Sequence, residues 1–225
     1  YYRNNSTDWQ DLIFRTALMH NHQINLSGGS ESNQYAITGN FFSQDGIVIN
    51  SDLKRASLRA NIDSKISNWI SVQTSLTASR TFSNVAFSEG DGAQGGGVIN
   101  GALAIPSTMY VYNEDGTYST MNQTPYGVTT GNPYALAELA KDKSTIDRVI
   151  ANVNLKFNLN KITDGLALEI RGGTDYSNAF RDSYLPSTVF QGESDNGIAT
   201  KGWNRRSVYL NENLLTYQKT FGKHA

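Results

Sequence analysis

RASLRANIDSKI at 55–66, SNW at 67–69 and ISVQTSLTASRTF at 70–82 form the stretch that decides the expected fold. In both long runs, alternate positions separate small aliphatic side chains from polar ones. Successive side chains of a strand point to opposite faces, so the pattern predicts a two-faced β-hairpin with a short turn at 67–69. One face carries Ala56, Leu58, Ala60, Ile62, Ile70, Val72, Leu76 and Ala78, and the other carries Arg55, Arg59, Asn61, Asp63 and Gln73.

Two architectures fit this hairpin. About a dozen residues per strand are enough to cross a bilayer when tilted, which favours a transmembrane β-barrel whose lumen is lined by the five polar residues named above. The alternative is a soluble antiparallel sheet with one wet face, as in a β-sandwich. The two differ in what covers Leu58, Ile62, Val72 and Leu76, because only a sandwich buries them under a second sheet.

Composition narrows the class of protein. The 225 residues carry a net charge of −1, which provides no basic field for nucleic acid. Mean hydropathy is −0.44, and no apolar run reaches the length of a membrane helix. This hydropathy is compatible with a barrel, since barrel strands are only half apolar. The chain has no cysteine, so disulfides and thiolate metal sites are excluded.

The rest of the chain alternates strand patterns with turns and loops. We expect one partial barrel segment over 1–225, with a pre-strand segment at 1–20 and long loops at 84–140 and 180–197. We expect one or two short helices, and both chain ends look cut from a longer protein. Short turns at 67–69 and 161–165 contrast with the long loops, an asymmetry typical of periplasmic turns and extracellular loops. Further strand patterns cover 21–27, 34–43, 149–160, 166–176, 198–205 and 206–221.

No motif supports catalysis, a resident metal or a cofactor. His20 and His22 have no third ligand nearby, so we expect no zinc site. Glu169 and Asp175 accompany Arg171 on a polar face, which suits a solvated lumen better than an acid–base pair. The glycines at 90–97 lack the Gly-Lys-Ser/Thr that follows a phosphate-binding loop. We therefore predict that the chain is not an enzyme.

Aromatic residues near the loops are candidates for ligand binding. Tyrosine and tryptophan rings with polar groups beside them suit sugar faces or peptide side chains. The alternatives are loop packing and an interfacial girdle of a barrel. The candidate binding residues are Tyr110, Tyr112, Tyr118 and Trp203.

Several motifs in a fixed order resemble the SusC/RagA-like TonB-linked outer-membrane transporters. Each motif is short, and their order across nearly the whole chain carries the resemblance. They are Asp8-Trp9-Gln10-Asp11 with Phe14-Arg15, Ser27-Gly28-Gly29, Tyr35, Asp45-Gly46-Ile47, Arg59-Ala60-Asn61, Ala102-Leu103, Ile105-Pro106, Asn113-Glu114-Asp115-Gly116, Asn132-Pro133 and Thr220-Phe221-Gly222-Lys223-His224.

The resemblance implies a 22-stranded barrel in the outer membrane of a Gram-negative bacterium, filled by an N-terminal plug. It also implies TonB-driven import of glycan or peptide fragments with a SusD-like surface lipoprotein. We expect the plug, the TonB-contacting segment and the remaining strands to lie outside these 225 residues. We expect oligosaccharides as substrates on family precedent alone. The rival functions are a soluble carbohydrate-binding sandwich and a passive porin or adhesin barrel.

Overall fold

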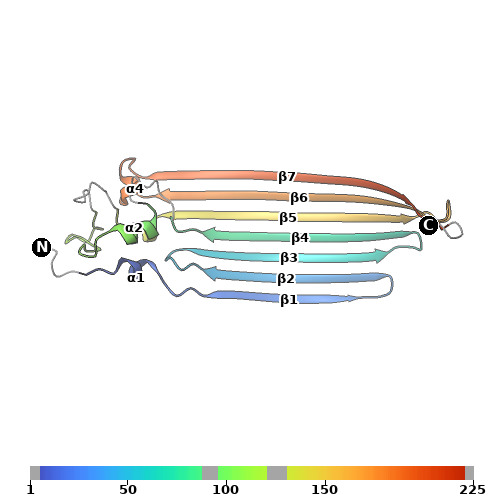
Figure 1. Ribbon diagram of the computed structural model, residues 1–225, viewed down its shortest axis with the longest axis horizontal. Coiled ribbons are helices and arrows are strands. Elements are labelled where there is room, and N and C mark those ends of the chain that lie inside the picture. The colour runs from blue at the N-terminus through green and yellow to red at the C-terminus, as the bar shows by residue number, and fades with distance from the viewer. Residues whose placement is uncertain (1–5, 88–95, 121–130, 221–225) are drawn as a thin grey trace.

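The computed structural model describes residues 6–87, 96–120 and 131–220. Within these residues, seven strands form one antiparallel sheet in which each strand pairs with the next (Figure 1). This confirms the predicted all-β meander of long amphipathic strands. The strands are β1 (Met19–Gly29), β2 (Asn33–Asp45), β3 (Asp52–Lys65), β4 (Ile70–Asn84), β5 (Lys141–Asn158), β6 (Leu166–Leu185) and β7 (Ile198–Tyr217).

The hairpin β3–β4 has the two faces that its sequence predicts. Its register pairs Ala60 with Leu76 and Asp63 with Gln73, so aliphatic and polar residues occupy opposite faces of the sheet. The turn closes because the Ser67 hydroxyl accepts hydrogen bonds from the backbone N–H groups of Trp69 (3.3 Å) and Ile70 (3.2 Å). Ser67 thus supplies the turn chemistry that aligns the two strands.

The sheet is a single layer over the described residues. Leu58 is 51% exposed and Leu76 is 39% exposed, and β1 and β7 are exposed along their whole lengths. No second sheet from the described parts of the chain covers the aliphatic face, which argues against the sandwich.

Within the described ranges, no helix is both long and apolar enough to cross a membrane.

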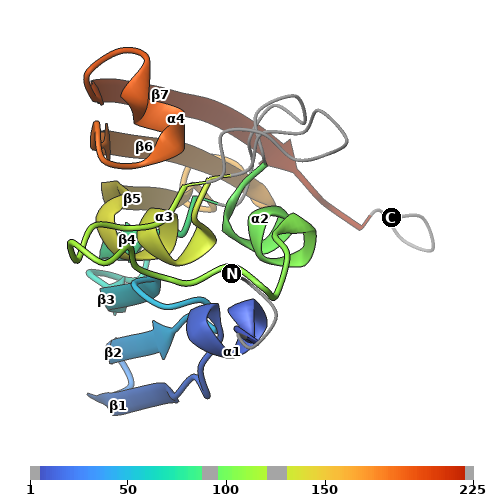
Figure 2. The same ribbon diagram turned by 90° about the vertical axis from the view of Figure 1, so that its left-hand side faces the viewer.

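The buried core lies at one end of the sheet, which we call the helix end, instead of across its faces. Four short helices meet there among the described residues, where the sequence predicted one or two (Figures 1 and 2). They belong to the segment before β1 and to the links β4–β5 and β6–β7, so the core joins distant parts of the chain. The helices are α1 (Trp9–Ile13), α2 (Val98–Ala104), α3 (Pro133–Leu139) and α4 (Phe190–Glu193), and the buried residues include Trp9, Ile13, Val48, Val98, Leu136 and Val189.

Side-chain caps hold these helices in place. The Asp8 carboxylate accepts hydrogen bonds from two backbone N–H groups in the first turn of α1, each at 3.1 Å. Asn132 caps α3 in the same way and donates its amide to the Val111 carbonyl at 2.8 Å. Asn132 therefore ties α3 to the small hairpin formed by the bridge between Tyr112 and Tyr118.

The predicted loop over 180–197 and the predicted split of the last strand are wrong in part. Residues 180–185 continue β6, and β7 is one strand where two were expected. Arg181 lies in the β5–β6 ladder and binds the Asp142 carboxylate across it, with Nε to Oδ1 at 2.7 Å. Both strands have 20 residues, more than the roughly 9–11 that a bilayer-crossing strand needs, so the polar residues at their ends remain in the sheet.

Candidate functional site

The five predicted lumen residues lie on one face of the sheet, which we call the polar face. They alternate along β3 and β4 with the aliphatic residues, and the face continues on the later strands. Gln73 is opposite Asn154 on β5, Asn154 is opposite Arg171 on β6, and Arg171 is opposite Glu212 on β7. The sequence had placed Arg171 on a solvated polar face, but its alignment with Gln73 appears only in the structure.

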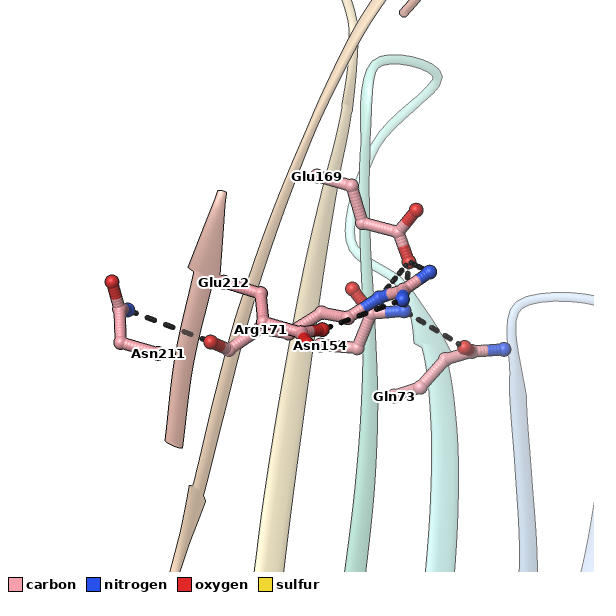
Figure 3. Close-up of polar contacts among 6 residues, drawn as sticks. All are labelled: Gln73, Asn154, Glu169, Arg171, Asn211 and Glu212. Carbon is pink, nitrogen blue, oxygen red and sulfur yellow. Dashed lines mark hydrogen bonds and ion pairs between the residues drawn. The ribbon is translucent and has the colours of Figure 1, made fainter. Parts of the chain in front are cut away.

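Hydrogen bonds link these residues across four strands (Figure 3). Asn154 Nδ2 lies 2.6 Å from Glu169 Oε1 and 3.4 Å from Gln73 Oε1. Arg171 donates from Nε to Glu169 Oε1 at 2.9 Å, and its Nη1 lies 3.6 Å from Glu212 Oε2. Arg171 thereby pairs with two carboxylates, one on its own strand and one on β7, as expected for a hydrated wall and not for a reactive pair.

An open hollow of about 490 Å³ lies over the middle of the polar face. Asn61, Asp63 and Gln73 line it together with Asn152 and Arg171. Arg55 and Arg59 belong to the same face but are not among the lining residues, and the Arg55 guanidinium stands 5.9 Å from the Phe42 ring centre. The structure therefore unites three of the five predicted residues in one hollow.

The described residues offer no acid–base pair and no metal centre. Arg148 engages both oxygens of Asp175, at 2.9 and 2.7 Å, while Arg171 engages Glu169. The His20 and His22 rings stack 6.3 Å apart on β1. Among the residues that can be placed, no group of three or more His, Cys, Asp or Glu side chains could hold a metal ion.

Three of the candidate binding aromatics gather at the helix end. The Tyr112 and Tyr118 rings lie 5.1 Å apart, and Tyr134 lies 6.3 Å from Tyr118. Burial, together with a 2.6 Å hydrogen bond to the Glu138 carboxylate, raises the pKa of Tyr118 above its usual value. Tyr110 and Tyr112 are each 48% exposed and line a hollow of about 500 Å³. Tyr118 thus supports the cluster, whereas the rings of Tyr110 and Tyr112 remain half-exposed at the hollow.

Trp203 does not belong to this cluster or to a loop. It lies in β7 opposite Phe180, on the aliphatic face of the sheet. Its indole N–H donates to Asn178 Oδ1 at 2.6 Å. The sequence placed it in a strand over 198–205 but near a loop over 180–197, and residues 180–185 of that loop in fact continue β6. Its position fits the interfacial girdle better than the substrate-binding role that the sequence suggested.

Aromatic rings mark both ends of the aliphatic face. Phe82 and Trp203 lie toward the helix end, and the rings of Trp69 and Phe157 lie 6.4 Å apart at the turn end. Phe82 is opposite Thr145, and Thr145 and Phe157 are about 40 Å apart along β5 at roughly 3.3 Å per residue. A strand tilt of about 40° reduces this to roughly 30 Å, the thickness of a bilayer core.

Comparisons with known proteins agree with this arrangement. No family model matches the chain. The TonB-dependent receptor P3 of Formosa agariphila is 37% identical over 221 residues, which cover 97% of this chain and 22% of that receptor. The TonB-dependent receptor SusC of Bacteroides thetaiotaomicron is 27% identical over 240 residues, covering 96% of this chain and 23% of SusC.

A solved structure of the RagAB peptide transporter has the same fold over 98% of this chain, with a TM-score of 0.76 and 21% identity. The match covers 24% of the transporter chain, so our chain spans less than a quarter of the proteins it resembles. The single-layer sheet, its two faces and these relatives lead to one assignment. The chain belongs to the SusC/RagA-like TonB-dependent transporters and corresponds to a segment of their β-barrel.

Proposed function

We propose that this chain forms part of the wall of a TonB-dependent nutrient importer in the outer membrane of a Gram-negative bacterium. The observation that carries the proposal is the exposed aliphatic face between two aromatic rows, backed by a hydrogen-bonded polar face. In a bilayer, the aliphatic face lies against lipid and the polar face lines the interior. The outer edges of β1 and β7 then pair with further strands, because lipid offers no partner to an open edge.

In this proposal the helix end faces the outside of the cell. The links at 30–32, 66–69 and 159–165 lie at the other end, and they are shorter than 85–140 and 186–197 at the helix end (Figure 1). Short periplasmic turns and long outer loops are the usual arrangement in outer-membrane barrels. The two hollows then have different roles, with the polar face lining the interior and the tyrosine hollow lying at the outer rim.

The substrate in this proposal is an oligosaccharide, taken up with a SusD-like lipoprotein and driven by TonB through parts of the protein outside this chain. Those partners follow from the likeness to SusC. The exposed rings of Tyr110 and Tyr112 offer apolar faces beside polar groups, which suits sugar rings. A role in binding and passage, without catalysis, agrees with the names of the relatives, which are receptors and a transporter.

A peptide is the second candidate substrate. The RagAB structures with this fold are titled as a peptide transporter and importer, and tyrosine rings also bind peptide side chains. Calorimetry on the full transporter with its lipoprotein partner separates the two, using a glycan panel and a peptide panel. We expect glycan binding that weakens in Tyr110→Ala and Tyr112→Ala, while Tyr209→Ala on the aliphatic face of β7 serves as the matched control. Binding of peptides without any glycan response would reverse the assignment.

A further inference from the structure

A polar row crosses the aliphatic face near its helix end. The register places Arg80 on β4, Asp147 on β5, Asn178 on β6 and Arg205 on β7 side by side. Asp147 binds Arg80 with two hydrogen bonds, of 2.5 and 2.8 Å, so the charge of Arg80 is balanced within the row. The neighbour of Arg205 is an amide instead of a carboxylate. The row therefore leaves one positive charge without compensation on this face.

Arg205 is held by aromatic rings. Its guanidinium lies 4.9 Å from the Trp203 ring centre and 6.0 Å from that of Tyr176. The indole N–H of Trp203 is fixed by Asn178, at 2.6 Å. Among the described residues, no carboxylate forms an ion pair with Arg205. Stacking orients a guanidinium without using its N–H groups, so they remain able to bind an anion.

Further cations lie next to Arg205. Lys201, Trp203 and Arg205 alternate along β7 and so share the aliphatic face, with Lys201 toward the helix end. The Lys201 side chain is 89% exposed and lies 3.9 Å from Asp182, a distance and exposure at which an ion pair contributes little. Lys143 lies on the other side of Asp182 in the same row. At this corner of the sheet, Lys143 and Lys201 thus flank one carboxylate, and Arg205 adds a third cation four residues further along β7 on the same face.

The depth of the corner restricts its ligand. The row of Arg80 and Arg205 lies two residues inside the row of Phe82 and Trp203, at the border between the aliphatic band and the helix end. Lysine and arginine side chains at this depth extend to the headgroup layer. A dissolved anion would not be confined to this layer, whereas the phosphate of a membrane lipid lies in it.

We propose that Arg205 and Lys201 bind the phosphate of an anionic lipid in the outer leaflet, a phosphorylated glycolipid such as lipid A, with Trp203 against its sugar. The two cations match the negative charge, and the exposed indole provides the flat surface that sugar rings bind. The inference rests on the proposed placement of the aliphatic face against lipid.

Native mass spectrometry of the full-length transporter tests this site, with diphosphorylated lipid A and dephosphorylated lipid A as probes. We expect the phosphorylated form alone to give a retained adduct in the wild type. Arg205→Gln should lower its occupancy about fivefold, the ratio expected for one cation near an anionic surface. Arg205→Lys should retain most of the binding. Arg206→Gln is the matched control, since Arg206 is the next residue on β7 and faces the opposite side.

Folding of each variant is checked separately by heat-modifiable electrophoretic mobility. If Arg205→Gln does not fold, Lys201→Gln replaces it, because Lys201 is nearly fully exposed. A folded Arg205→Gln that keeps wild-type occupancy overturns the site, as does equal binding of the dephosphorylated lipid or of inorganic phosphate alone. Failure of the wild type to enter membranes would instead overturn the proposed function, so the two failures are distinguishable.

Discussion

Replacing Leu76 with arginine tests the membrane-facing side of the sheet. Leu76 lies on β4 between Ala60 and Ala151, about midway between the two aromatic rows. Both neighbours are alanines, so an arginine there has no partner for its charge. An arginine on the lipid face near the midplane costs about 2–4 kcal/mol. That corresponds to roughly a 30- to 900-fold loss in the equilibrium between folded and unfolded barrel.

The matched control is Ser75→Arg, one residue away on the polar face. Ser75 lines the central hollow with Asp63, which offers space and a counter-charge. The change loses only the 3.3 Å hydrogen bond from Asn152, so we expect a cost below about 1 kcal/mol. Urea unfolding of the full-length protein from lipid vesicles, followed by tryptophan fluorescence, gives both values. Equal costs, or a larger cost for Ser75→Arg, would refute the assignment of the faces.

Three further predictions concern the two ends of the sheet. Gly165→Ala should lower the free energy of unfolding by about 1–3 kcal/mol, because Gly165 has φ +87° and a Cβ there would lie 2.0 Å from a backbone oxygen. Gly116 has φ +82° but open space around it, so Gly116→Ala should cost less stability in the same denaturant titration. On intact cells, a membrane-impermeant maleimide should label Glu114→Cys but not Asn68→Cys until the outer membrane is opened, and the reverse order would invert the topology. Since the pKa of Tyr118 is raised, the folded state binds its proton more tightly. Its contribution to stability is complete below the ordinary tyrosine pKa near 10 and is lost as pH rises toward the folded value. A fall in the urea midpoint above pH 10 that is smaller in Tyr118→Phe should reveal this loss.

Local sequence patterns predicted the parts of the fold that local physics controls. Strict alternation over 55–82 predicted both strands of the hairpin and its faces, since a slip of one residue would exchange the two faces. Asp8, followed by Trp9 and an apolar residue at 13, is a local pattern for a capped helix or a turn, and the structure has a capped helix there. Loop-like residues such as Arg181 and Asp182 hid the last part of β6, because the alternation of polar and apolar residues stops there.

Contacts across long loops could not be predicted in the same way. The link between β4 and β5 spans 85–140, so the alignment of Gln73 with Asn154 depends on a register that no turn residue fixes. The polar alternation of β5 was visible in the sequence, but its partners were not. The core at the helix end could not be predicted for the same reason, since Ile13, Val98 and Leu136 come from three distant segments. Neutral loop composition also left the choice between sugar and peptide open.

Spin labels along β4 test the central claim most directly. Single cysteines at each position from 71 to 79 can carry the label in the membrane-reconstituted protein, because the 225 residues themselves contain no cysteine and any cysteine elsewhere in the protein is replaced. We predict a period of two, with labels at Val72, Leu76 and Ala78 accessible to oxygen dissolved in lipid. Labels at Gln73 and Ser75 should instead be accessible to a water-soluble nickel complex or buried against protein. Accessibility without alternation, or alternation in the opposite phase, would contradict a barrel wall with these two faces.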